Sequence, residues 1–247
     1  MTFREYLGRS RAPRYSLLFA LPLLLLYEGL SAALTGSAVE GVRNGADVLL
    51  KTLFLALGGR TGLYAFGVAL LGGGAFLVWR DRRKAGEPVD GRVFVWMLAE
   101  SAAYAAVFGA VVGWLTQLVL TGPRSLSTGA GAALDLPTQL VISLGAGLYE
   151  ELAFRVLLVG LLLRLFLMLL PSGKLVATSL AVVVSALIFS AFHYVGPLGD
   201  PFAVPSFTFR AIAGVAFSVL FVTRGFGIAA WTHALYDLGL SLIQAAR

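Results

Sequence analysis

Long apolar runs recur along this chain, and their length decides what it can fold into. Seven such runs occupy residues 15–34, 61–79, 93–120, 136–170, 175–196, 207–223 and 228–244. A helix needs about 20 apolar residues to cross the ~30 Å hydrocarbon core of a bilayer, and these runs approach or exceed that length. Hydrophobic residues make up 58% of the chain and charged residues only 13%, a balance that a soluble domain does not have. The sequence therefore predicts an all-α transmembrane helix bundle with about seven spans.

Two segments outside these runs mark the organisation of the chain. Residues 47–57 are apolar but too short to span and carry Lys51, so we predict an interfacial or re-entrant helix there. Residues 121–135 are rich in Gly, Ser, Ala and Thr, a composition typical of a linker. We therefore expect membrane helices and loops over residues 1–136 and a motif-bearing core over residues 137–247, within one integrated membrane domain.

Basic residues lie mainly between the apolar runs, and the formal net charge is +6. The basic residues do not form one continuous stripe along the chain. Their excess over acidic residues therefore favours a lipid bilayer over a nucleic acid as the partner. In a seven-span arrangement most of the 19 Lys and Arg residues fall on the side of the amino terminus. The positive-inside rule then predicts a cytoplasmic N-terminus and an external C-terminus in the plasma (inner) membrane. Glu28 and Glu100 lie within spans, where we expect them to make interhelical polar contacts.

Two adjacent glutamates and an arginine interrupt the most apolar part of the chain. A charge in hydrocarbon costs at least ~2.5 to 3.5 kcal/mol, so such residues indicate a functional site. On an α-helix Glu151 and Arg155 share a face, with the acid on the favourable N-terminal side. Glu150 is rotated off that face and has no intrahelical cation, which leaves it free for chemistry. The small Ala146 and Gly147, one turn earlier, would let another helix or a peptide approach closely.

The chain has two histidines and no cysteine. The lack of cysteine excludes disulfides, Cys-ligated zinc, iron–sulfur centres and thiol nucleophiles. Each histidine lies in an apolar run with a partner four residues away, Phe189 before His193 and Asp237 after His233. We expect the glutamates, both imidazoles and this aspartate to share one polar pocket, whereas the long side chain of Arg155 is able to reach outward instead.

These residues form three ordered motifs, Glu150-Glu151-x-x-x-Arg155, Phe189-x-x-x-His193 and His233-x-x-x-Asp237. Together they resemble the motifs of the CPBP family of intramembrane endopeptidases (CAAX proteases and bacteriocin-processing enzymes, also called the ABI family). The resemblance covers residues 137–244. It implies an all-helical membrane endopeptidase that cuts near the carboxyl end of proteins or processes peptides.

The resemblance also implies a role for each matched residue: water activation by Glu150 and His193, oxyanion stabilisation by His233 with Asp237, and support of Glu150 by Glu151 and Arg155. These roles agree with the needs of peptide hydrolysis, which are a base for water, a proton for the leaving amine and donors for the developing oxyanion.

The last motif position departs from the family pattern, because many members have Asn where this chain has Asp237. An ionised aspartate accepts hydrogen bonds but donates none. We therefore expect Asp237 to fix the tautomer and orientation of His233, which leaves the histidine as the oxyanion donor.

The same residue types also allow a metal-dependent reaction. Glu150, His193 and His233 form a His₂Glu set of the kind that binds catalytic zinc, and Asp237 would be a natural hydrogen-bond partner of a ligand. The sequence has no HExxH helix, however. We favour a glutamate-type reaction without a cofactor and keep zinc as the alternative.

Other functions account for buried charges as well. A non-enzymatic transporter or scaffold would keep Glu, Arg and His groups as a buried polar lock, and a bis-histidine haem protein would show a Soret band. We favour a peptidase acting on proteins or peptides with an apolar or lipidated carboxyl-terminal segment that enters from the bilayer. With a cytoplasmic N-terminus, His193 lies near the outer end of its span, so the pocket is expected to open outward.

Overall fold

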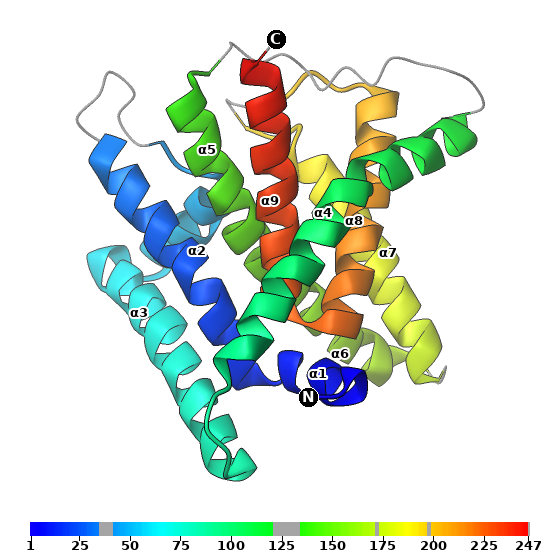
Figure 1. Ribbon diagram of the computed structural model, residues 1–247. Coiled ribbons are helices and arrows are strands. Elements are labelled where there is room, and N and C mark those ends of the chain that lie inside the picture. The colour runs from blue at the N-terminus through cyan, green and yellow to red at the C-terminus, as the bar shows by residue number, and fades with distance from the viewer. Residues whose placement is uncertain (35–41, 121–133, 171–172, 197–198, 247) are drawn as a thin grey trace.

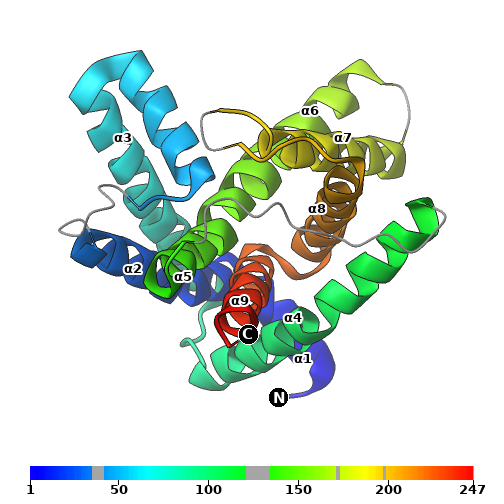
Figure 2. The ribbon, with the colours of Figure 1, turned by 90° about the horizontal axis from the view of Figure 1, so that it is seen from above.

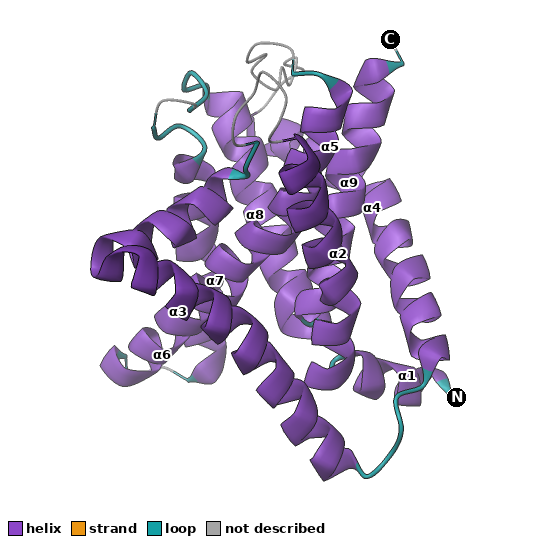
Figure 3. Ribbon diagram, turned by 90° about the vertical axis from the view of Figure 1, so that its left-hand side faces the viewer, coloured by secondary structure: helices purple, strands orange, loops and turns teal. Residues whose placement is uncertain are grey.

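Helices are the only regular secondary structure in the part of the chain that the computed structural model describes, residues 1–34, 42–120, 134–170, 173–196 and 199–246. Figure 3 shows these helices in purple. The elements are α1 (Phe3–Ser10), α2 (Pro13–Leu34), α3 (Gly45–Ala85), α4 (Gly91–Leu120), α5 (Leu136–Gly145), η1 (Ala146–Val159), α6 (Gly160–Leu169), α7 (Lys174–Phe192), α8 (Val204–Arg224) and α9 (Phe226–Ala245). The all-helical prediction is confirmed. Most of the predicted linker, residues 121–133, lies outside the described residues.

The long helices run alternately up and down, so the two termini lie at opposite ends of the bundle (Figure 1). Six helices in the described ranges are long and apolar enough to cross a membrane, and one of them is the continuous 34-residue helix formed by α5, η1 and α6. The expected seventh span, α9, is not among the six, because His233, Asp237 and Gln244 make it more polar. The protein is an integral membrane protein.

The expected short helix and the second span are two limbs of one bent helix, α3. The bend lies at Gly58 and Gly59, and Gly59 has φ 57°, a conformation that glycine adopts at little cost. The limbs then pack against each other, with the rings of Phe54 and Phe66 5.1 Å apart. A Cβ at Gly62 would lie 1.9 Å from the carbonyl oxygen of Phe54. The short segment is therefore a helix, as predicted, that meets the span at this kink and folds back on it, as Figure 2 shows from above.

Helix α9 is surrounded by other helices and carries part of the predicted site. It packs against α2, α4, α5, η1 and α8 (Figure 2). Small side chains make this packing close, and Ala230 and Ala234 are fully buried. A Cβ at Gly147 would lie 2.5 Å from the carbonyl oxygen of Ala230. The close approach predicted at Gly147 is confirmed, and the element that fills the space is α9.

The substitution Gly147→Ala is expected to lower the free energy of unfolding by about 1–3 kcal/mol, because the added methyl group overpacks a closed contact. Thermal unfolding of the detergent-solubilised protein measures the change. Gly160→Ala is the matched control, since Gly160 lies in the same continuous helix and a Cβ there meets nothing within 4 Å. The control should be neutral or up to about 1 kcal/mol more stable. Equal stability of the two variants would contradict the packing argument.

The glutamates outside the motif make interhelical contacts, as predicted. Glu100 on α4 accepts hydrogen bonds from the Arg224 guanidinium at 2.6 and 2.7 Å and from the Tyr6 hydroxyl. Glu28 on α2 accepts from Arg43 at 2.7 Å and from Tyr149 at 2.7 Å. These two carboxylates therefore join helices through paired charges.

Candidate active site

The motif-bearing helix is wound as a π-helix between Ala146 and Val159. Backbone hydrogen bonds in a π-helix run from i to i+5, and such segments occur mostly at functional sites. Residues four and five apart then lie near one face, so Arg155 interacts electrostatically with both Glu150 and Glu151. Its Nε lies 3.3 Å from Glu151 Oε2. The predicted pair is confirmed, but the regular α-helical winding used to predict it was wrong.

Arg155 points into the bundle, so the expectation that it reaches outward is wrong. Its side chain is fully buried, and its guanidinium carbon lies 4.2 Å from the centroid of the Phe189 ring and 5.5 Å from that of Phe217. A cation over an aromatic face is attracted by the negative face of the ring. Within the described residues, the guanidinium nitrogens have no hydrogen-bond partner. The buried anion of Glu151 and the two rings replace water around this charge.

His233 lies among three carboxylates. Its Nδ1 is 2.8 Å from Glu151 Oε1, whereas its Nε2 is 3.4 Å from Asp237 Oδ2 and 4.0 Å from Glu150 Oε2. The imidazole also stacks on Phe217 with 4.3 Å between centroids and 18° between planes. The close partner that orients the ring is therefore Glu151, not Asp237 as predicted. A carboxylate on Nδ1 directs Nε2 toward Glu150.

His193 follows the last residue of α7 and has a defined hydrogen-bond partner. Its Nδ1 lies 2.9 Å from the carbonyl oxygen of Phe189. Because a carbonyl only accepts, Nδ1 carries the proton, and Nε2 of the neutral ring keeps its lone pair. The Phe189 ring lies 4.9 Å from the His193 ring and 6.5 Å from the His233 ring. His193 also interacts electrostatically with Glu150 and His233, so the structure brings both imidazoles to the same glutamate.

Sequence reasoning missed Asn44, the residue before α3. Its Nδ2 donates a hydrogen bond to Glu150 Oε1 at 2.9 Å, and both side chains are buried. An Asn directly before a helix is a recognisable N-cap signal. The sequence holds no signal for its partner, which is 106 residues away. Glu150 makes no direct ion pair with Arg155, which pairs with Glu151 instead, but one of the Glu150 oxygens is already held by Asn44.

The zinc alternative requires three ligands that converge on one point. The described ranges contain no group of three His, Cys, Asp or Glu side chains placed to hold a metal ion. Zinc ligands lie ~2.0–2.2 Å from the metal, which puts neighbouring ligand atoms roughly 3.3 Å apart, whereas His233 Nε2 and Glu150 Oε2 are 4.0 Å apart. The residues as arranged do not fit a zinc site.

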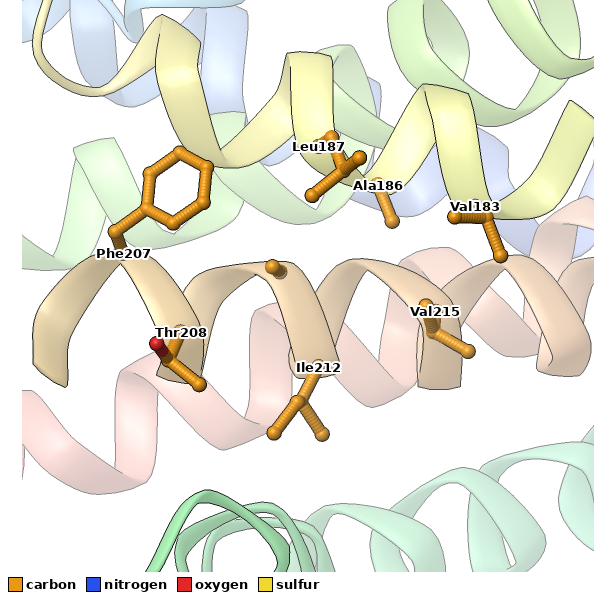
Figure 4. Close-up of a pocket in the computed structure, with 8 residues that line it drawn as sticks. Val183, Ala186, Leu187, Phe207, Thr208, Ile212 and Val215 are labelled. Atoms are coloured by element: carbon orange, nitrogen blue, oxygen red, sulfur yellow. The ribbon is translucent and has the colours of Figure 1, made fainter. Parts of the chain in front are cut away.

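An apolar groove of about 240 Å³ lies between α7 and α8 (Figure 4). It is lined by Val183, Ala186, Leu187, Phe207, Thr208, Ala211, Ile212 and Val215. None of the six predicted site residues lines it. The predicted site residues therefore lie outside this groove, in the cluster around Glu150 and His233.

Carboxylates and imidazoles are the side chains that most often act in general acid–base catalysis. Residues 132–239 match the family model described as Type II CAAX prenyl endopeptidase Rce1-like. The matched segment, a little under half of the chain, is similar to this family of proteases. The resemblance carried by the three motifs is thereby confirmed. No curated protein and no solved structure gives a significant match.

Proposed function

We propose that the chain is an intramembrane endopeptidase that hydrolyses a peptide bond near the carboxyl-terminal end of membrane-anchored or lipidated proteins, with prenylated proteins as the main substrate class. The family description supports the substrate class. The observation that carries the proposal is the position of Glu150, whose Oε2 faces His233 Nε2 at 4.0 Å inside a buried cluster.

The separation of these two atoms suits one water molecule. At 4.0 Å the atoms are too far apart for a direct hydrogen bond, and a contact beyond 3.5 Å is a place for a bridging water. Glu150 takes a proton from this water while the water oxygen bonds to the scissile carbonyl carbon. His193 Nε2, with its free lone pair, is the second proton acceptor of the site. These steps give Glu150 and His193 the water-activating role.

His233 supplies the donor for the oxyanion. With protons on both nitrogens, it donates from Nδ1 to Glu151 and from Nε2 to the negative oxygen of the tetrahedral intermediate. Asp237, whose side chain is 29% exposed, lies beside Nε2 and stabilises the imidazolium. The proton held by Glu150 then passes to the leaving nitrogen as the carbon–nitrogen bond breaks. Arg155 neutralises Glu151, so that the two glutamates remain charged side by side.

A pair of matched peptides tests the substrate class. One peptide carries a farnesylated cysteine three residues before its carboxyl end, and the other has the same sequence without the lipid. The purified protein is expected to cleave the farnesylated peptide with at least about tenfold higher kcat/KM, which corresponds to about 1.4 kcal/mol of transition-state binding. Mass spectrometry identifies the broken bond. Equal cleavage of both peptides would contradict a prenylated substrate class, and cleavage of neither would contradict the proposed function.

A further inference from the structure

Both ends of the Asn44 amide are in use, which fixes its orientation. Oδ1 accepts the backbone N–H of Ala46 at 2.8 Å and caps α3, while Nδ2 donates to Glu150 Oε1 at 2.9 Å. Because the cap needs an acceptor, the amide cannot turn over without losing both bonds. The NH₂ group is therefore committed to Glu150.

A chain of buried hydrogen bonds through Tyr27 and Asp47 fixes the position of the Asn44 backbone. Its backbone N–H donates to the Tyr27 hydroxyl at 3.0 Å, and this hydroxyl donates to Asp47 Oδ2 at 2.8 Å. The side chains of Tyr27 and Asp47 are fully buried, and Lys51 pairs with Asp47 at 2.7 Å. The chain of bonds thus runs from a neutralised carboxylate through Tyr27 and Asn44 to Glu150.

Gly145 provides the space for this contact. A Cβ at Gly145 would lie 2.5 Å from the Tyr27 ring and 2.7 Å from the Cβ of Asn44. Any larger residue would push both groups away from the motif-bearing helix. The motif-bearing helix therefore carries no side chain at the position where Tyr27 of α2 and Asn44, at the start of α3, pack against it.

We propose that Asn44 is a positioning residue for Glu150, an inference that rests on the proposed function. By holding Oε1, the amide leaves Oε2 as the oxygen that faces His233 Nε2. A base held within a few tenths of an ångström of its working position loses little rate to misplacement, whereas a 1 Å error can cost about 10²-fold. Asn44 lies outside the matched segment 132–239, so this role belongs to the amino-terminal part of the chain.

The variant Asn44→Ser separates positioning from capping. Serine caps a helix about as well as asparagine but has no amide to donate to Glu150. With the farnesylated peptide, kcat is expected to fall about 10- to 100-fold while KM and the unfolding temperature stay close to wild type. Asn44→Asp keeps the size and the cap but cannot donate and adds a like charge, so its loss of kcat should be at least as large. Ser185→Ala is the control, because Ser185 also donates to the same helix, at the Phe154 carbonyl, but does not touch Glu150.

The outcomes separate this inference from the proposed function. If Glu150→Gln removes activity while both Asn44 variants keep the wild-type kcat, the positioning role is wrong and the proposed function stands. A rise in KM with unchanged kcat would overturn it as well. If Glu150→Gln keeps wild-type activity, Glu150 is not the base and the positioning role of Asn44 falls with it, whereas absence of cleavage by the wild-type protein would contradict the proposed function itself. Should Asn44→Ser not fold, Asn44→Thr, which also caps a helix and also lacks the amide, gives the same reading.

Discussion

Glu150→Gln is expected to lower kcat/KM for the farnesylated peptide by about 10²- to 10⁴-fold, the usual contribution of a general base. Glutamine has nearly the same shape and still presents an oxygen to the Asn44 amide, so the helix packing should not change. The amide has no basic oxygen to take a proton from water, and its NH₂ group cannot replace Oε2 opposite His233. The loss should therefore appear in kcat, with little change in KM.

The control for this prediction is another glutamate in the membrane region. Glu100 is partly buried and paired with Arg224, but it lies outside the Glu150–His233 cluster. Glu100→Gln is expected to lower stability while the kcat of the folded protein remains within a few-fold of wild type. An active Glu150→Gln enzyme, with kcat within about threefold of wild type, would show that another group activates the water.

The sequence predicted those features that depend on local spacing. Apolar run length was enough to predict the helical bundle, because a membrane leaves few other ways to pair the backbone. The contact between Glu151 and Arg155 was also predictable, since these residues lie four apart on one helix. The small side chain of Gly147 indicated a close helix approach before any partner was known.

Features that depend on contacts between distant segments were not predictable. The bond from Glu151 to His233 joins residues 82 apart, and the bond from Asn44 to Glu150 joins residues 106 apart. The spacing of apolar and charged residues along the sequence does not indicate which distant residues will form such pairs. The inward course of Arg155 has the same origin, because its guanidinium lies over Phe189 of α7 and Phe217 of α8. The sequence therefore indicated residues that the fold brings together, but it assigned the orientation of His233 to Asp237 instead of Glu151.

Arg155→Met should lower the free energy of unfolding by about 3–5 kcal/mol, which is the expected effect of removing one partner from a buried ion pair. The Arg155 and Glu151 side chains are both fully buried, so the remaining carboxylate would stay in a medium that cannot solvate it. The variant also loses the stacking of the guanidinium on Phe189. Thermal unfolding in detergent measures the difference.

Two further variants decide whether the uncompensated charge is the cause. Arg9→Met removes an exposed ion pair with Glu87, for which a change below about 1 kcal/mol is expected. The double variant Arg155→Met/Glu151→Gln removes both charges of the buried pair and should be more stable than Arg155→Met alone, because a neutral amide costs less to bury than an unpaired carboxylate. If the double variant is instead the less stable one, Arg155 acts mainly through its packing on Phe189 and Phe217. The charge of Glu151 would then be balanced by His233 rather than by the arginine four residues along the helix.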